Sequence, residues 1–494
     1  MKSRTLNKEE LDAFGAELDA LRAETLAKVG EEDAQYIREM VQLCRDYEIL
    51  GRELLKTDGQ NPVSWLKGAY SLGIAKILEN MEIGHNVMHG QYDFMNDPDL
   101  HSQTYEWDTA SHSDGWRHSH NYMHHTYTNI VGKDRDLGYG ILRLTDDEPW
   151  KPQHLLQPIW NTALSLLFEY GVALHDLETD RVKNGEKQLA LKDVVPVLRK
   201  IFAQAAKDYV YFPATAGLNA VPVLTGNVAA NLMRNVWAHA IIFCGHFTAD
   251  AETFKQEEVT DESRGAWYLR QLRGSSNLTG DWWFHILSGN LSHQIEHHLF
   301  PDIPAWRYAE MAPRVREICA KYGQHYNTGS FLKQYGEVLK RIFRYSLPDG
   351  LFKNPSGLLA ASAQSFENLT ARSFISFQLR AMVGGKVRNS HTARRQKLRH
   401  TSYSPSPAKG RGPLADASQR GVGLRNKLLD QLIHQLRVRA LHPVVGVNIV
   451  QLGLRSDIRD VGVNFRCDGE VVFGDDYLHR NIDPTGNLNP FALQ

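Results

Sequence analysis

The first 61 residues are polar overall but carry apolar positions at helical spacing. Asn7 and Glu10 have the spacing of a capping box, which marks the start of a helix. We therefore predict that residues 1–61 form a helical N-terminal segment. The apolar residues that share one face of its first helix are Leu11, Phe14, Leu18 and Leu21.

Four later stretches are apolar enough to meet a membrane, but each lacks the clean run of about 20 apolar residues that spans a bilayer. Lys76 interrupts the first stretch and Glu169 interrupts the second. The mean hydropathy of the chain is −0.41, so hydropathy alone leaves a soluble and a membrane protein equally open. The stretches are 62–83, 154–174, 208–225 and 227–247.

The composition of the chain changes after about residue 350. Residues 386–427 are rich in Arg, Lys, Ser, Gly and Pro, which is typical of disorder, and 443–473 alternate apolar and polar positions as short strands do. The net charge of −1 conceals a balance of +10 in residues 372–494 and −11 in 1–371. We predict a largely irregular, basic tail over 349–494, interpret it as a solvated appendage, and expect no nucleic-acid partner.

Three histidine clusters are the strongest chemical signal in the chain. They read HNVMH from His85, HNYMHH from His120 and HQIEHH from His293. Offsets of three, four and five residues bring side chains onto one face of a helix, so each cluster aims two or three imidazoles at one point. Because imidazole binds zinc, copper, iron and nickel, the clusters predict a metal centre.

The number of histidines indicates two metal ions. A catalytic zinc ion takes three protein ligands, whereas the clusters supply eight histidines. Histidine-rich nitrogen sites suit redox iron, which can activate dioxygen. We therefore predict a di-iron centre.

One shared centre also constrains the membrane topology. If the second and third clusters form one site, an even number of spans separates them. We expect 208–225 and 227–247 to be that pair, a hairpin turning near Gly226, and the second apolar stretch to be an interfacial or buried helix. The first stretch has no evident partner, because residues 41–61 are too polar to span.

The clusters and their flanks resemble the three histidine boxes of the membrane fatty acid desaturases. The matching stretches are KILENMEIGHNVMH ending at His89, HNYMHHTYTN starting at His120 and GNLSHQIEHHLFP ending at Pro301. Within that family the chain is most similar to bacterial acyl-CoA desaturases of the linoleoyl-CoA or stearoyl-CoA type. The resemblance covers roughly residues 30–345.

The resemblance implies an all-α fold with two to four membrane spans and a cytosolic helical cap that holds two irons. It implies a multi-pass protein, in a bacterial inner membrane, whose metal site faces the cytoplasm. The domains expected are a cytosolic N-terminal segment (1–61), a desaturase domain (62–348) and the tail (349–494). The residues that match the family's metal ligands are His85, His89, His120, His124, His125, His297 and His298.

Two further ligand positions have more than one candidate. The third box has Gln294 where animal stearoyl-CoA desaturases have histidine, and His293 can substitute because its spacing to the following pair repeats that of the second box. Family members also take a histidine from the last membrane helix. His246 has the better sequence context there, and Asn235 with His239 reproduces the Asn-x3-His spacing of the animal enzymes.

Carboxylates beside the boxes suggest supporting roles. Glu82 precedes the first box by three residues, and Glu296 directly precedes the histidine pair of the third. Such carboxylates commonly orient metal-bound imidazoles. Asp134 and Asp136, which follow the second box, are interpreted as caps of local turns.

The resemblance implies an oxygen-dependent desaturase that inserts a cis double bond into a fatty acyl chain, with acyl-CoA as substrate. Two external electrons are needed, yet the sequence shows no dinucleotide fingerprint and no His-Pro-Gly-Gly haem motif. We therefore expect no bound flavin, haem or NAD(P) domain, and a separate donor: ferredoxin, a flavin-dependent NADPH reductase or cytochrome b5. The alternatives are a fatty acid or alkane hydroxylase with the same centre, and a non-catalytic metal-binding membrane protein.

Overall fold

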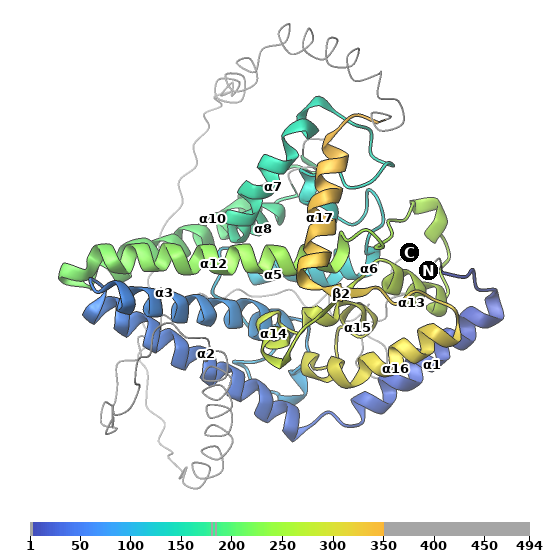
Figure 1. Ribbon diagram of the computed structural model, residues 1–494, viewed down its shortest axis with the longest axis horizontal. Coiled ribbons are helices and arrows are strands. Elements are labelled where there is room, and N and C mark those ends of the chain that lie inside the picture. Colours follow the sequence, from blue (N-terminus) through green and yellow to red (C-terminus); the bar gives the residue numbers. More distant parts are fainter. Residues whose placement is uncertain (1–2, 179–180, 183–184, 350–494) are drawn as a thin grey trace, which may run out of the picture. The chain divides into compact units, whose positions relative to one another are not determined.

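The computed structural model describes residues 3–178, 181–182 and 185–349, and this part of the chain is mostly helical (Figure 1). The longer helices are α1 (Lys8–Leu26), α2 (Glu31–Asp58), α3 (Pro62–Ile77), α7 (Gln157–Leu166), α8 (Phe168–His175), α10 (Leu191–Ala206), α12 (Ala220–His246), α13 (Arg264–Arg273), α16 (Tyr308–Lys321) and α17 (Phe331–Ser346). The shorter helices are α4 (Asn86–Met88), α5 (Ser113–Trp116), α6 (His125–Tyr127), α11 (Phe212–Ala214), α14 (Trp282–Leu287) and α15 (Gln294–Leu299). The π-helical segments are η1 (Leu78–His85), η3 (Arg117–His124) and η6 (Lys207–Tyr211). The 3-10 turns are η2 (Asp93–Met95), η4 (Leu137–Gly140), η5 (Pro152–Leu156), η7 (Gly217–Asn219), η8 (Gln256–Val259), η9 (Leu291–His293) and η10 (Ala305–Arg307).

The N-terminal helix forms as its sequence predicts. The Asn7 side chain accepts from the backbone N–H of Glu10, and the Glu10 carboxylate accepts from the backbone N–H of Asn7, each at 2.9 Å. The apolar face of α1 packs against α13, α15 and α16, with Phe14 and Leu18 fully buried. A Cβ on Gly265 of α13 would lie 1.8 Å from the carbonyl oxygen of Leu11, so glycine is required at this crossing.

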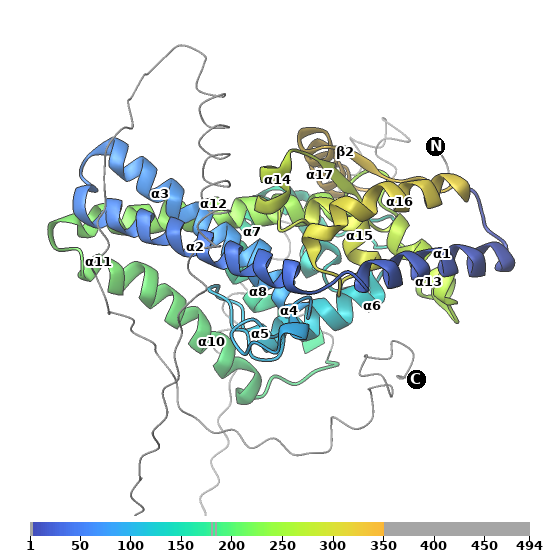
Figure 2. The same cartoon turned by 90° about the horizontal axis from the view of Figure 1, so that it is seen from below.

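The helix α2 packs along α3, and α12 packs on the other side of α3 (Figures 1 and 2). The first apolar stretch, which has no evident spanning partner in the sequence, packs against both of these helices. Although α2 is polar outside, Ile37, Met40 and Leu55 are buried in the bundle. Gly51 permits the close approach, because a Cβ there would lie 2.8 Å from the carbonyl oxygen of Gly68.

The predicted turn near Gly226 is absent from the described residues, because α12 runs unbroken from Ala220 to His246. The segment before it, formed by α10, η6 and α11, turns into α12 around η7. Gly226 serves packing instead, since a Cβ there would lie 2.6 Å from Leu55 Cδ1. The neighbouring Asn227 is buried and donates to the carbonyl oxygen of Asp208 on η6.

The second apolar stretch forms two helices, α7 and α8, which meet at the non-helical residue Leu167 (φ −114°, ψ 30°). In the part of the chain that the structure describes, no helix combines the length and the apolar character needed to cross a membrane. The irregular tail and the short strands predicted after residue 349 lie outside the described residues.

A small parallel sheet departs from the expected all-helical fold. β1 (Asn277–Thr279) pairs with β2 (Thr328–Ser330), with Asn277 opposite Thr328. Strands of three residues carry too little periodicity to be recognised in a sequence. The sheet matters for the site, because Asn277 Oδ1 accepts from the backbone N–H of Ile295 at 2.8 Å and so positions α15.

Candidate metal centre

Eight histidines from four separate segments of the chain converge in the interior. His85, His89, His120 and His297 form one group, in which one ring nitrogen of each lies within 4.8 Å of the others. A second group of the same compactness contains His124, His246 and His298, and a third, which shares members with both, contains His125, His297 and His298. The structure therefore brings together two adjoining histidine-lined centres.

Parts of the first two histidine clusters lie on π-helical segments, although an α-helical face was expected. The π-helical segment η1 ends at His85, and η3 contains His120 and His124. At the end of η3 the backbone N–H of His125 reaches the carbonyl oxygen of His120, five residues back. Single π-helical turns are frequent at functional sites, and here the wider turn lets one short segment serve both histidine groups.

Hydrogen bonds at Nδ1 orient two of the imidazole rings, so that Nε2 of each ring points into the centre. Nδ1 of His124 lies 3.0 Å from a carboxylate oxygen of Asp134, and Nδ1 of His246 lies 3.1 Å from the carbonyl oxygen of Gly274. Because those oxygens only accept, each Nδ1 carries a proton, and in the neutral ring each Nε2 carries a lone pair. Nε2 of His246 lies 3.3 Å from Nε2 of His124. Two lone pairs this close repel each other unless a cation lies between them.

Other imidazole nitrogens in the centre lack hydrogen-bond partners among the described residues. The Nε2 atoms of His85, His89, His120, His125 and His297 are buried and unpaired. Burial lowers the pKa of His89 and of His297 well below the usual value, so both rings are neutral. A buried polar nitrogen without a partner costs roughly 1–3 kcal/mol. Five of them aimed at one interior are the donor set of metal ions, so the residues present fit metal binding.

The structure does not bring His293 to the centre. Its ring stacks on His285, with ring centroids 4.6 Å apart. The spacing argument assumed one continuous helix, but His293 ends the 3-10 turn η9 with non-helical angles (φ −103°, ψ 52°) before α15 begins. Gln294 does reach the centre, because its Nε2 lies 3.0 Å from Nε2 of His246.

Of the candidates on α12, only His246 joins the histidine groups among the described residues. Nε2 of His239 lies 3.1 Å from Oδ1 of Asn161 on α7, and its ring stacks on Phe243. Asn235 donates to the carbonyl oxygen of Leu166 at 2.9 Å. These two residues therefore join α12 to α7, about two and three helical turns from His246.

The glutamates beside the boxes hold the ligand-bearing segments, and within the described part of the chain neither is hydrogen-bonded to an imidazole. Glu82 accepts from Tyr36 Oη at 2.7 Å and from Asn290 Nδ2 at 3.0 Å. Glu296 accepts from Asn277 Nδ2 at 2.7 Å and from Tyr326 Oη at 2.8 Å. Each carboxylate thus holds a histidine box against a segment that is distant in the sequence.

The carboxylates that do contact the rings are those interpreted as turn caps. Asp134 caps its turn by accepting from the backbone N–H of Asn129, and it also accepts from His124. Asp136 lies 3.3 Å from Nδ1 of His120 and 3.1 Å from Nε2 of His175. In the sequence, the Asp-x-Asp pair shortly after a histidine box was the signal that could have identified these two carboxylates as partners of the rings. For Gln271, whose Oε1 lies 3.1 Å from Nδ1 of His298, the sequence offered no signal.

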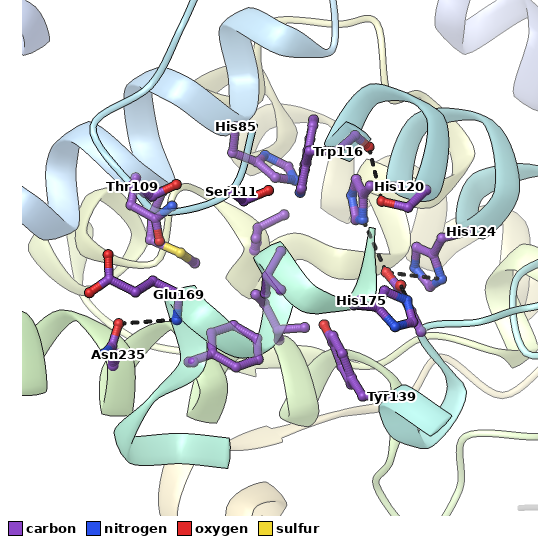
Figure 3. A pocket seen from close by; sticks show the side chains of 18 of the residues that line it. His85, Thr109, Ser111, Trp116, His120, His124, Tyr139, Glu169, His175 and Asn235 are labelled. Carbon is purple, nitrogen blue, oxygen red and sulfur yellow. Dashed lines mark hydrogen bonds and ion pairs between the residues drawn. The ribbon is translucent and has the colours of Figure 1, made fainter. Parts of the chain in front are cut away.

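A pocket opens beside the centre and runs away from it (Figure 3). His85, His120, His124 and His246 line one part. Figure 3 places Glu169 and Asn235 on the side opposite His120 and His124. The walls between them are largely apolar, with Met81, Trp107, Trp116, Phe168, Val172 and Ile242. A narrow apolar pocket that passes a metal centre suits a hydrocarbon chain.

Several known proteins are similar in sequence to this chain. A profile of the fatty acid desaturase family matches residues 63–330. The chain is 47% identical over 346 residues to the NADPH-dependent stearoyl-CoA 9-desaturase of Mycobacterium tuberculosis, across 69% of this chain and 81% of that protein. It is 25% identical over 270 residues to the sn-1 linoleoyl-lipid 6-desaturase of Synechocystis sp., across 53% and 74%. It is 26% identical over 232 residues to human fatty acid desaturase 3, across 46% and 49%. With its histidine boxes gathered into one centre, the chain belongs to the fatty acid desaturase family.

Proposed function

We propose that this desaturase inserts a cis double bond into the acyl chain of an acyl-CoA, at two iron ions held by the histidine groups. The observation that carries the proposal is the set of buried, unpaired Nε2 atoms converging beside an apolar pocket. Acyl-CoA is the substrate class in the name of the mycobacterial relative. Dioxygen is the co-substrate.

In this proposal His85, His89, His120 and His297 hold one iron, and His124, His246 and His298 hold the other. His125 lies within reach of both groups. When bound, the irons supply the oxidising power that removes two hydrogens from an unactivated pair of methylenes. The protein itself binds and positions the acyl chain and keeps water from the reacting carbons.

Particular residues carry out these tasks. Trp116 stacks on His120, with centroids 4.5 Å apart, and lines the pocket, so it fixes the ring and covers the acyl chain at the same place. Asp134 and Asp136 hold the protons of His124 and His120 on Nδ1, which keeps each Nε2 free for metal. Gln294, beside His246, presents a neutral amide to the pocket.

The electrons come from outside the chain in this proposal. A relative is named NADPH-dependent, which supports a flavin-dependent NADPH reductase over the other donors expected from the resemblance. Ferredoxin and cytochrome b5 stay as predicted alternatives.

We also propose that the protein is a multi-pass protein of the bacterial inner membrane with the metal centre on the cytoplasmic side. The supporting observation is the set of exposed large apolar side chains on several helices. They include Leu66 of α3, Phe202 of α10 and Val221 of α12, which are 63%, 67% and 68% exposed. Such surface is stable in contact with lipid. Retention in the membrane fraction after alkaline extraction is expected, and release into the wash would contradict it.

Fatty acid profiling of a desaturase-deficient bacterial host tests the reaction. The chain, expressed with a matched electron donor, is expected to yield a new cis-monounsaturated acid and to bind two irons. The variant His124→Ala/His125→Ala is the control and is expected to lose both. A hydroxy acid in place of the double bond would contradict desaturation, and so would an unchanged profile from the iron-loaded protein.

A further inference from the structure

A buried ion pair closes the far side of the pocket. Arg234 Nη2 of α12 lies 2.6 Å from Glu169 Oε1 of α8, and each side chain is 2% exposed. Both residues line the same pocket as the histidines. This pair is outside the metal centre, and the reaction proposed above does not use it.

Neighbouring side chains position Arg234 and the backbone of Glu169. Arg234 Nε donates to Asn235 Oδ1 at 3.0 Å, and its Nη2 donates to Asn231 Oδ1 at 3.3 Å. The backbone N–H of Glu169 donates to the same Asn235 oxygen at 3.4 Å. Breaking a buried ion pair leaves an uncompensated charge, so a methyl group cannot push these side chains apart as it can repack an apolar wall. The pair therefore forms an end wall of the pocket that an acyl chain cannot displace.

The length of α12 sets the distance between the ion pair and the metal centre. His246, the ligand, ends α12, and Arg234 lies twelve residues earlier on the same helix. Twelve residues of α-helix rise about 18 Å. An extended chain advances about 1.2 Å per bond, as extended backbone does. At that rate 18 Å corresponds to about 15 bonds. A chain therefore meets the pair when about 15 carbons extend beyond the reacting methylenes, and a shorter chain ends before it.

We propose that the Arg234–Glu169 ion pair is the specificity-determining floor of the acyl pocket, which limits how many carbons extend beyond the reacting methylenes. The proposal rests on the function proposed above, because it takes the occupant of the pocket to be an acyl chain. In the simpler interpretation the pair only joins α8 to α12. The two interpretations differ in the chain-length dependence of binding.

Binding of saturated acyl-CoAs, lengthened two carbons at a time, tests the proposal on the full-length iron-loaded protein without reductant. Each methylene that enters the pocket is expected to raise affinity about fourfold. The rise in affinity is expected to end at the chain length whose methyl end reaches the ion pair, and this chain length is called the stop below. In Glu169→Ala/Arg234→Ala the stop is expected to move to chains at least two carbons longer. A stop that stays in place in this variant would overturn the proposal, as would wild-type affinity that is independent of chain length.

A matched control and a milder variant keep the test decisive. Lys76 of α3 and Asp208 of η6 form another buried ion pair, 2.7 Å apart, but neither lines the pocket. Lys76→Met/Asp208→Leu is expected to keep the wild-type stop. If the alanine variant does not fold, Glu169→Asp retains the pair with a shorter arm and is expected to favour longer chains by one or two carbons. An unmoved stop in Glu169→Asp would then overturn the proposal.

The binding assay also separates the two proposals. A wild-type protein that shows the stop in binding, yet forms no double bond with oxygen and electrons supplied, would overturn the proposed reaction and support the pocket floor. A protein that desaturates but whose stop is unmoved in the alanine variant would support the reaction and overturn the floor.

Discussion

The carboxylate of Asp134 accepts a hydrogen bond from Nδ1 of His124 at 3.0 Å, and this contact aims Nε2 of His124 into the metal centre. The carboxylate cannot donate, so it selects one tautomer of the ring. The backbone also depends on Asp134, which accepts from the N–H of Asn129 at 2.7 Å. The second histidine box and the turn that follows it are thus positioned by one side chain.

Asp134→Asn should weaken metal binding without removing a ligand. The asparagine amide can donate to Nδ1, which favours the tautomer with the proton on Nε2, where the metal lone pair is needed. Loss of such an outer partner lowers metal affinity about 10–100-fold. Iron content after dialysis against a chelator series measures the effect. Asp193→Asn, at the exposed start of α10, serves as control, and equal iron retention in both variants would contradict the prediction.

His293 and His298 should differ sharply when each is replaced by alanine. His298 belongs to two histidine groups, whereas His293 stacks on His285 outside them. We expect His298→Ala to lose iron and activity, and His293→Ala to retain both. Metal analysis and product yield of the two variants provide the comparison. Loss of iron from His293→Ala would mean that its segment refolds toward the centre on loading.

Glu296 should make the protein less stable as the pH rises. Burial raises the pKa of Glu296 from 4.5 to about 7. The folded state therefore holds its proton more tightly than the unfolded state does, so stability is full below pH 4.5 and falls between the two pKa values. The loss approaches about 3 kcal/mol at 1.36 kcal/mol per pKa unit.

Thermal unfolding of wild type and Glu296→Gln at a series of pH values measures this contribution. Glutamine does not titrate, so the stability advantage of wild type over the variant should shrink as the pH rises from 4.5 to about 7. A constant difference across that interval would show that Glu296 is ionised throughout.

Two glycine-to-alanine substitutions should have opposite effects. In Gly265→Ala the new methyl would lie 1.8 Å from the carbonyl oxygen of Leu11, so α1 must move away from α13. Overpacking of this kind costs roughly 1–3 kcal/mol. In Gly336→Ala, within α17, the methyl meets no atom within 4 Å. Its higher helix propensity should stabilise the protein by up to about 1 kcal/mol. Melting temperatures of both variants check the pair, and equal shifts would refute the packing argument.

Local sequence was sufficient for several features of this protein. The capping box of Asn7 and Glu10 and the buried face of α1 depend on spacing within one helix. The three boxes were recognisable because their ligands recur at short offsets, and all three lie within residues 63–330, which match the desaturase family. Features of this kind need no knowledge of distant contacts, since the interacting residues are neighbours in the chain.

Only the tertiary structure decided which candidate residues meet. His239 and His246 lie on one helix, yet α7 engages the first while the boxes surround the second. Likewise Gly226, a turn signal locally, lies inside α12 because Leu55 of α2 fills the space that its missing side chain leaves. The partners in these contacts are far apart in sequence, so spacing carries no trace of them. The sequence thus determined the chemistry available to the protein, and long-range packing determined which groups surround the metal centre and where its pocket ends.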